Sequence, residues 1–245
     1  IDGHDLDAIR NAIKTAKENG VGMVAVINSS HCGALSYFVQ VAARENLIGI
    51  ALTHTDKSVV PFGSVKPFFG TNPLAFAFPA KRNEPIILDM ATSNVALGKI
   101  LHARELGNKV PMDWGVDEKG NPSTNPHQIV HLLPMGGAKG YGLAMVVDIL
   151  SGILTGSAFG PHISMMYGDY DKYRGLGHFL CVIDPGVFTN TDLFLEQIDQ
   201  MIDEIHELPP APGFDKVMVP GEPEQLQEKR RNENGIPLPE SVYEF

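Results

Sequence analysis

Cysteine is scarce in this chain, since Cys32 and Cys181 are the only two cysteines among 245 residues. Two thiols are too few for a disulfide framework or a zinc–thiolate site, and they favour a reducing compartment. Metal-binding motifs are lacking as well. His127 and His131 have the i, i+4 spacing of a helical metal pair, but no H-E-x-x-H or paired-cysteine motif accompanies them. We therefore predict no metal site and a cytoplasmic location.

Long apolar runs and long basic runs are also missing. The most apolar helical segment, residues 143–154, is too short to cross a bilayer and contains Asp148. Acidic residues outnumber basic ones by 29 to 19, and the formal net charge of -10 repels nucleic-acid phosphates and anionic lipids. The basic cluster at residues 229–231 has acidic neighbours and is typical of a solvated helix face. We expect neither a nucleic-acid partner nor a membrane partner.

Apolar periodicity predicts helices and strands that alternate along the chain. Continuous apolar runs at residues 21–27 and 48–52 are typical of strands buried on both faces. A helical pattern at residues 34–43 separates them, so we expect a βαβ-like unit with the two strands paired in parallel. Further helices are expected at residues 6–16, 95–105, 140–154 and 191–208, and further strands at 74–78, 86–88 and 179–183. Such interleaving favours an α/β fold.

Two polar loops follow the first two expected strands, and they carry His31 and Asp56. Parallel pairing of those strands would bring the two side chains together at one edge of the sheet. A carboxylate that orients an imidazole makes an acid/base pair for proton transfer. The alternative is a hydrogen-bonded loop histidine beside an exposed aspartate. Cys32 is a weaker nucleophile candidate, because neighbouring residues usually point apart.

Three other segments could bind an anion or a cofactor. Lys139 and Gly140 stand just before an apolar helix, where backbone N–H groups attract phosphate or carboxylate, although a plain helix start explains them equally well. Residues 89–92 could form only a helix cap, and residues 221–223 only a turn. No G-x-G-x-x-G follows the first strand, so an ordinary Rossmann cofactor site is not supported.

Taken together, these segments resemble the malate/L-lactate dehydrogenase family that is unrelated to the Rossmann-type enzymes. The resemblance runs from end to end of the chain and rests on blocks in the family's order. They are Ser30-His31-Cys32-Gly33-Ala34, Ser36-Tyr37-Phe38, Pro61-Phe62-Gly63, Gly70-Thr71-Asn72-Pro73-Leu74-Ala75-Phe76, Leu88-Asp89-Met90-Ala91-Thr92, Lys139-Gly140-Tyr141-Gly142-Leu143, Ala211-Pro212-Gly213-Phe214 and Pro220-Gly221-Glu222. Residues 36–40 and 164–167 further resemble the family members that act on ureidoglycolate.

The resemblance implies an NAD(P)-dependent 2-hydroxy-acid dehydrogenase with the family's mixed-sheet α/β fold, usually a homodimer. His31 is then the acid/base residue and Asp56 lies beside it. Cofactor contacts are implied for Thr55, Asp89, Met90, Ala91, Lys139, Gly221, Glu222 and Pro223, to which we add Gly140 as the neighbour of Lys139. The implied reaction is oxidation of (S)-ureidoglycolate to oxalurate with NAD, in allantoin degradation and purine catabolism, and NADP is not excluded as the cofactor.

One departure from the family pattern concerns the start of the chain. The family carries an N-terminal helical segment with an H-S-H-G motif and an arginine that helps hold the substrate carboxylate, and no such motif occurs here. We expect residues 1–245 to form the cofactor-binding and catalytic region without that segment. Two alternatives remain open: a malate, L-lactate or sulfolactate dehydrogenase, and a non-catalytic homologue that only binds the cofactor.

Overall fold

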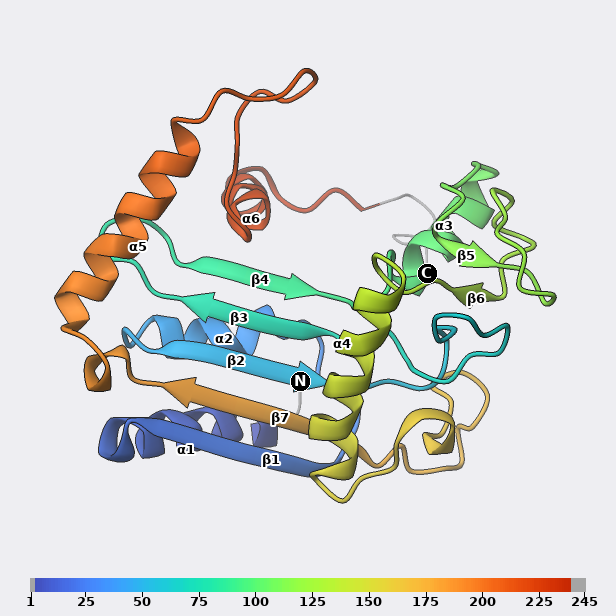
Figure 1. Ribbon diagram of the computed structural model, residues 1–245, viewed down its shortest axis with the longest axis horizontal. Coiled ribbons are helices and arrows are strands. Elements are labelled where there is room, and N and C mark those ends of the chain that lie inside the picture. Colours follow the sequence, from blue (N-terminus) through green and yellow to red (C-terminus); the bar gives the residue numbers. More distant parts are fainter. Residues whose placement is uncertain (1–2, 239–245) are drawn as a thin grey trace.

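A five-stranded sheet forms the centre of the protein in a computed structural model that describes residues 3–238. Its strand order is β1-β7-β2-β3-β4, and every neighbouring pair is antiparallel (Figure 1). The strands are β1 (Val21–Ser29), β7 (Leu176–Ile183), β2 (Ile48–Thr53), β3 (Leu74–Phe78) and β4 (Ile86–Met90). The α/β fold class expected from the sequence is confirmed.

The expected parallel pairing of β1 with β2 is wrong, because β7 lies between them. Both strands are antiparallel to β7, so they run in the same direction without contacting each other through backbone hydrogen bonds. Burial of β1 on both faces is wrong as well. β1 is an edge strand in which Met23 is 63% exposed and Ile27 is 55% exposed. A continuous apolar run does not distinguish a central strand from an edge strand with one uncovered face.

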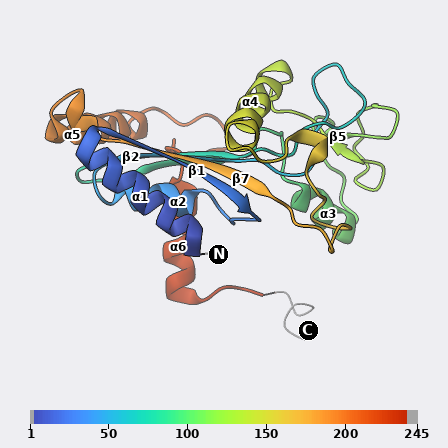
Figure 2. The ribbon, with the colours of Figure 1, turned by 90° about the horizontal axis from the view of Figure 1, so that it is seen from below.

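Helices cover both faces of the sheet (Figure 2). On one face α1 (Gly3–Asn19) packs on β1, and α2 (Ser36–Ala43) packs on β2 and β3. Gly22 permits the close approach of α1, since a Cβ there would lie 2.0 Å from the Ala12 carbonyl oxygen. On the other face lie α4 (Ala138–Asp148) and the π-helix η1 (Ile149–Ile153), where Val147 packs against Leu52 and Leu74.

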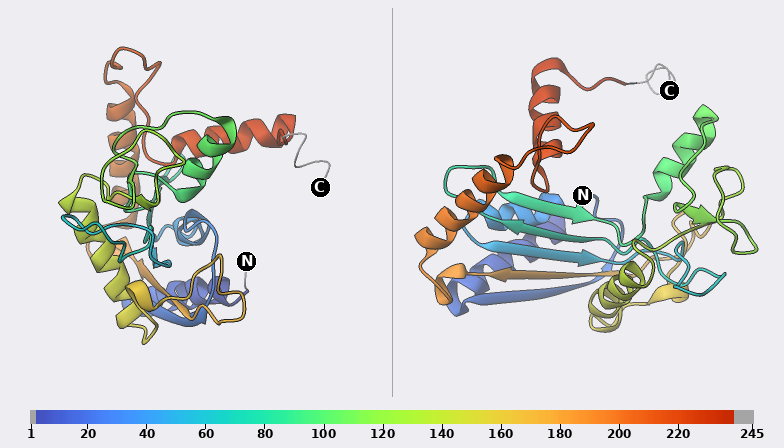
Figure 3. Two further views of the ribbon diagram at one scale, coloured as in Figure 1. Left: turned by 90° about the vertical axis from the view of Figure 1, so that its right-hand side faces the viewer. Right: turned by 45° about the horizontal axis from the view of Figure 1, so that its top comes forward.

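The remaining elements flank this sandwich (Figure 3). A small two-stranded sheet, β5 (Gly115–Val116) and β6 (His131–Leu132), packs with α3 (Leu97–Leu106) around a second apolar cluster that Trp114 joins. The helix α5 (Thr191–His206) lies at the opposite end of the large sheet, and α6 (Glu222–Asn234) follows it. Short 3-10 turns stand at Gly160–His162 and Pro185–Val187.

Most expected helices and strands appear within a few residues of their predicted bounds. The main difference is β4, which extends to Met90 and so places Asp89 inside a strand instead of after it. Among the described residues, no helix is long and apolar enough to span a membrane. That residues 1–245 form one catalytic region stays a prediction, and residues 1–2 and 239–245 lie outside the described part of the chain.

Candidate active site

The loops after β1 and β2 meet at one end of the sheet, where His31 and Asp56 line the same cavity of about 140 Å³. β7 holds both loops in place, because Ser29 pairs with Leu176 and Thr53 pairs with His178. The remaining lining residues include Cys32, Thr55, Thr71, Met166 and Arg174. The structure thus brings the two sequence-predicted residues into one pocket, by a route through β7 that differs from the expected strand pairing.

His31 is exposed, and its ring is fixed by a backbone contact. The Gly33 N–H donates a hydrogen bond of 2.9 Å to Nδ1 of His31. Gly33 has a φ of +80°, a left-handed conformation that glycine adopts without strain. Because Nδ1 accepts this bond, the neutral ring carries its proton on Nε2.

Asp56 does not make the expected contact with His31. Its Oδ1 accepts a short, charge-assisted hydrogen bond from Nη2 of Arg174, and both side chains are largely buried. Among the described residues, no hydrogen bond joins Asp56 to the His31 ring. The expectation that Asp56 orients His31 through such a bond is therefore corrected, since the guanidinium is the stronger partner for a carboxylate.

Two further histidines lie beneath these loops. His178 is 3% exposed, and its Nδ1 lies 2.7 Å from Oγ1 of Thr53. Burial lowers the pKa of His178 to about 4; the charges of His54 and His31 act in the same direction, while the Ser30 backbone opposes the shift. His178 is therefore neutral at pH 7, and its contact with Thr53 holds the end of β2 beside the site.

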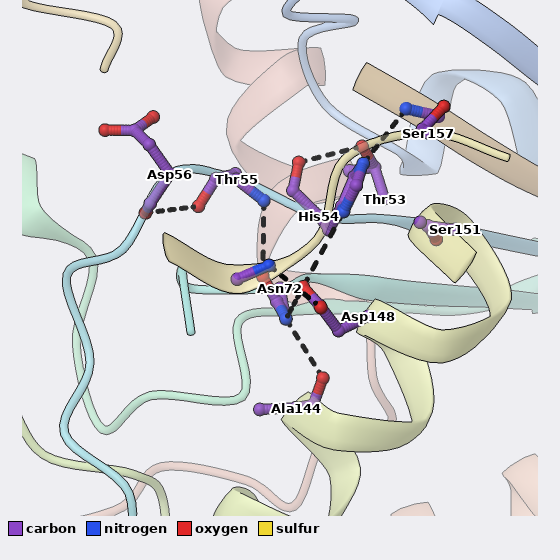
Figure 4. A network of polar contacts seen from close by, with 12 residues as sticks. Thr53, His54, Thr55, Asp56, Asn72, Ala144, Asp148, Ser151 and Ser157 are labelled. Atoms are coloured by element: carbon purple, nitrogen blue, oxygen red, sulfur yellow. Dashed lines mark hydrogen bonds and ion pairs between the residues drawn. The ribbon is translucent and has the colours of Figure 1, made fainter. Parts of the chain in front are cut away.

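His54 also lines the His31 cavity, and its ring belongs to a buried polar network that reaches α4 (Figure 4). It connects through Asp148 and Asn72 to the backbone N–H of Thr55. In the same view the Asp56 carboxylate points away from this network. Sequence reasoning missed Asn72, His54, Asp148, His178 and Arg174, although Asp148 was visible as a charge inside an apolar helix.

A second cavity, of about 850 Å³, holds three of the residues predicted to contact a cofactor, namely Asp89, Gly221 and Pro223. Asp89 connects it to the His31 loop, because its Oδ2 accepts the N–H of Ser36 at 2.7 Å. Gly221 has a φ of +89°, and a Cβ there would lie 2.8 Å from the Ile87 carbonyl oxygen. Glycine thus permits the close approach of residues 219–223 to β4, which forms one wall of the cavity.

Threonines and backbone groups connect the remaining predicted cofactor contacts. Oγ1 of Thr55 accepts the N–H of Thr71, whose carbonyl accepts both the N–H and the hydroxyl of Thr92. The Thr92 carbonyl in turn accepts the N–H of Met135, shortly before α4 begins with Lys139 in its first turn. Met90 and Ala91 directly precede Thr92, so Thr55, Met90, Ala91 and Lys139 lie along one connected path.

Two of the predicted cofactor residues have clear packing or bonding partners within the chain. Gly140 is buried, and a Cβ there would lie 2.4 Å from the Met135 carbonyl oxygen. Glu222 bonds to Lys216, His206 and the Val219 N–H. Burial raises the pKa of Glu222, but the bonds from Lys216 and His206 outweigh it and lower the pKa overall. Gly140 permits the close packing of α4 against Met135, and Glu222 fixes residues 216–222.

Among residues 3–238, no group of three or more His, Cys, Asp or Glu side chains could hold a metal ion. The site consists of a small pocket that holds a histidine, a carboxylate and a guanidinium, and a larger cavity is lined by Ala34 and Ser36, which directly follow the His31 loop. This arrangement suits proton transfer next to a bound organic cofactor.

Comparison with known proteins gives consistent results. The sequence profile described as malate/L-lactate dehydrogenase matches residues 6–245. A ureidoglycolate dehydrogenase (NAD(+)) from Escherichia coli is 43% identical over 237 residues, which cover 97% of this chain and 68% of the relative. A malate dehydrogenase from Pyrococcus horikoshii is 38% identical over 247 residues, with coverage of 97% and 68%. The solved structure of a sulfolactate dehydrogenase from Methanocaldococcus jannaschii superposes with a TM-score of 0.90 at 35% identity, covering 98% of this chain and 69% of that one.

Proposed function

The chain belongs to the malate/L-lactate dehydrogenase family, and from this premise we propose that it oxidises (S)-ureidoglycolate to oxalurate with NAD⁺. The proposal rests on the shared cavity of His31, Asp56 and Arg174, and on a second cavity, large enough for a dinucleotide, whose residue Asp89 bonds to the start of α2 directly after the His31 loop. The 43% identity to an enzyme named for this reaction supports the choice of substrate.

The large cavity suits the dinucleotide, which when bound supplies the hydride acceptor for the C2 hydrogen of the substrate. Asp89, Gly221 and Pro223 would hold it in that cavity. Lys139 and the first turn of α4 would face its phosphates, because helix N-termini attract anions. Glu222 would act indirectly, by fixing residues 216–222.

His31 would carry out the proton transfer. Nε2 accepts the proton of the substrate hydroxyl as the hydrogen on the same carbon leaves as hydride. For that step Nε2 must be free of its proton, so the proton has to sit on Nδ1, and the Gly33 N–H contact has to open. The Asp56 carboxylate lines the same pocket, where it is paired with Arg174.

Arg174 would bind the substrate carboxylate. Its guanidinium lies in the His31 cavity, its Nε is buried without a hydrogen-bond partner, and Asp56 holds it from one side. A guanidinium offers paired N–H donors that match a carboxylate. Asp56 therefore contributes mainly by fixing Arg174.

The cavity lining supports NAD over NADP. Three carboxylates, Asp89, Glu224 and Glu228, line it against a single lysine, Lys216. An acidic lining disfavours the extra phosphate on the ribose of NADP and accepts hydrogen bonds from a ribose hydroxyl. Oxidation of ureidoglycolate would place the protein in allantoin degradation, a branch of purine catabolism.

A substrate panel tests the proposal. NADH formation is measured at equal concentrations of (S)-ureidoglycolate, malate, L-lactate and sulfolactate, and again with NADP⁺. We expect the highest kcat/KM for ureidoglycolate with NAD⁺. Preference for malate would support the second candidate, which the likeness to the Pyrococcus horikoshii malate dehydrogenase favours. Cofactor binding without any turnover would instead identify a non-catalytic homologue.

The homodimer implied by the family resemblance is also a proposal. Leu143, Val146, Ile149 and Ile153 on α4 and η1 are 39–54% exposed, an apolar surface that suits an interface between subunits. Light scattering of the purified protein distinguishes a dimer from a monomer of 26.6 kDa.

A further inference from the structure

His54 is completely buried, although it directly precedes the cavity residues Thr55 and Asp56. Its Nε2 accepts the N–H of Gly177 at 3.0 Å, so the neutral ring carries its proton on Nδ1. Nδ1 lies 3.6 Å from Oδ1 of Asp148, the last residue of α4. The ring therefore joins the site loop to α4 and to the start of β7.

Asp148 is 2% exposed and is surrounded by N–H groups. It accepts a bond of 3.2 Å from the side-chain amide of Asn72 and one of 3.1 Å from the N–H of Gly160, while Nδ1 of His54 lies just beyond hydrogen-bond distance. The Asn72 carbonyl oxygen in turn accepts the backbone N–H of Thr55 at 3.2 Å (Figure 4). The same amide also donates to the Ala144 carbonyl oxygen at 2.9 Å, so the carboxylate and this carbonyl together fix the orientation of the amide that holds the site loop.

The backbone around this network departs from ordinary geometry at several points. Asn72 has a φ of +37°, which is rare outside glycine. Immediately after Asp148 the α-helix changes to a π-helix, a form that frequently marks functional sites. Gly152 leaves room for the ring, since a Cβ there would lie 3.0 Å from Nδ1 and Cε1 of His54. Strained backbone of this kind persists only where the surrounding structure enforces it.

A buried ion or polar pair is a poor way to stabilise a fold, because apolar side chains of similar volume often stabilise it equally well. The Asp148 and His54 pair therefore calls for a role beyond packing. We propose that Asp148 and His54 are positioning residues, which hold Asn72 so that Thr55 presents its hydroxyl and backbone to the bound dinucleotide. This proposal rests on the proposed dehydrogenase function.

The substitution Asp148→Asn tests the proposal. It puts an amide N–H₂ where one carboxylate oxygen faced N–H donors, so the Asn72 amide keeps only its bond to the Ala144 carbonyl and holds the N–H of Thr55 less firmly. We expect KM for NAD⁺ to rise about tenfold while kcat changes less than threefold. A KM for NAD⁺ within twofold of the unsubstituted protein overturns the proposal.

A pair of His54 variants provides a second test in case Asp148→Asn does not fold. His54→Asn can direct an amide N–H toward Asp148 from close to the position of Nδ1, whereas His54→Leu cannot. We expect KM for NAD⁺ to rise less in His54→Asn than in His54→Leu. Equal KM values in the two variants contradict the positioning role.

Asp199 offers a matched control. It is also 2% exposed and also accepts N–H groups, those of Arg82 and Asn83, but it lies on α5 at the far end of the sheet. Asp199→Asn should lower the melting temperature as much as Asp148→Asn and leave KM for NAD⁺ unchanged. A purely structural role for Asp148 predicts the same kinetics in both variants.

Amide hydrogen exchange at residues 55 and 56 separates this proposal from the proposed function, because it needs no turnover. We expect exchange at least tenfold faster in Asp148→Asn than in Asp199→Asn at matched stability. If the unsubstituted protein oxidises no 2-hydroxy acid, the proposed function fails and exchange still decides the role of Asp148. Equal exchange rates in the two variants would falsify the positioning role.

Discussion

Asp148 on α4 and Asp199 on α5 are buried to the same extent, but their surroundings differ. The two helices lie at opposite ends of one sheet (Figure 1). Asp199 accepts two backbone N–H groups and the side-chain amide of Asn83, at the turn between β3 and β4. Burial raises its pKa, but the N–H groups of Asn83 and Arg82 outweigh that effect and lower it. This carboxylate closes a turn and docks α5.

The end that carries Asp148 leaves polar atoms without partners. Among the described residues, the buried side-chain nitrogen and oxygen atoms that lack a hydrogen bond belong to His54, Ser151, Arg174 and His178. Unsatisfied buried polar groups cost stability, and they concentrate where function requires them. The buried carboxylate at the turn end is well partnered, whereas the opposite end, which carries the proposed site, leaves several buried polar atoms without hydrogen bonds.

The largest expected effect that distinguishes the two ends comes from His31→Gln. The variant loses the titratable imidazole, so we expect kcat to fall roughly 10²–10⁴-fold, the usual contribution of a general acid/base. The side chain is exposed and makes one backbone contact, so the melting temperature should stay nearly constant. Initial rates and thermal unfolding measure both effects, and unchanged turnover in a folded variant refutes the role of His31.

His178→Asn should change how stability depends on pH. The folded-state pKa is about 4 and the ordinary value is 6.5, so the unfolded chain binds the extra proton first as the pH falls. His178 therefore costs no stability above pH 6.5 and about 3 kcal/mol once the pH reaches 4. Asparagine keeps a polar atom near Thr53 without titrating. Urea unfolding from pH 7 to pH 4 should show a shallower loss in the variant, and identical slopes would contradict this account.

Arg174→Met should weaken substrate binding at the site end. Losing the charge pair that Arg174 would make with the substrate carboxylate costs about 2 kcal/mol, which predicts a roughly 30-fold higher KM for the 2-hydroxy acid. KM for NAD⁺ should change little. Arg82→Met removes the same charge at the turn end, where Arg82 pairs with Asp203, and should leave both KM values unchanged. Equal effects of the two substitutions would show that the ends do not differ in this respect.

The local structure was largely predictable from the sequence. Helical spacing located α1, α2 and α5, and Gly20 ended α1 with a φ of +85°, as expected. The strand order was not predictable, because apolar runs specify that a segment is a strand but not which strand is its neighbour. Nothing in residues 21–27 or 48–52 indicates that residues 176–183 lie between them.

The site was predictable in part for the same reason. His31 and Asp56 follow strands, so their place in polar loops follows from local pattern, whereas the meeting of the two loops depends on β7. Arg174 lies in an irregular segment with no periodicity. The positive φ of Asn72 could not be predicted from the sequence composition. The contacts of these residues depend on tertiary packing across the sheet, which a single sequence does not display.

The insertion of β7 has a consequence for how the protein is made. Thr53 and His178 are neighbours in the sheet but are separated by 125 residues of chain. At about 5–20 residues per second of synthesis, β2 is made roughly 6–25 s before the strand that joins it to β1, and β1 is made earlier still. During that interval their backbone edges are unpaired and open to association with other chains. We therefore expect the nascent chain to depend on protection during translation until β7 has emerged.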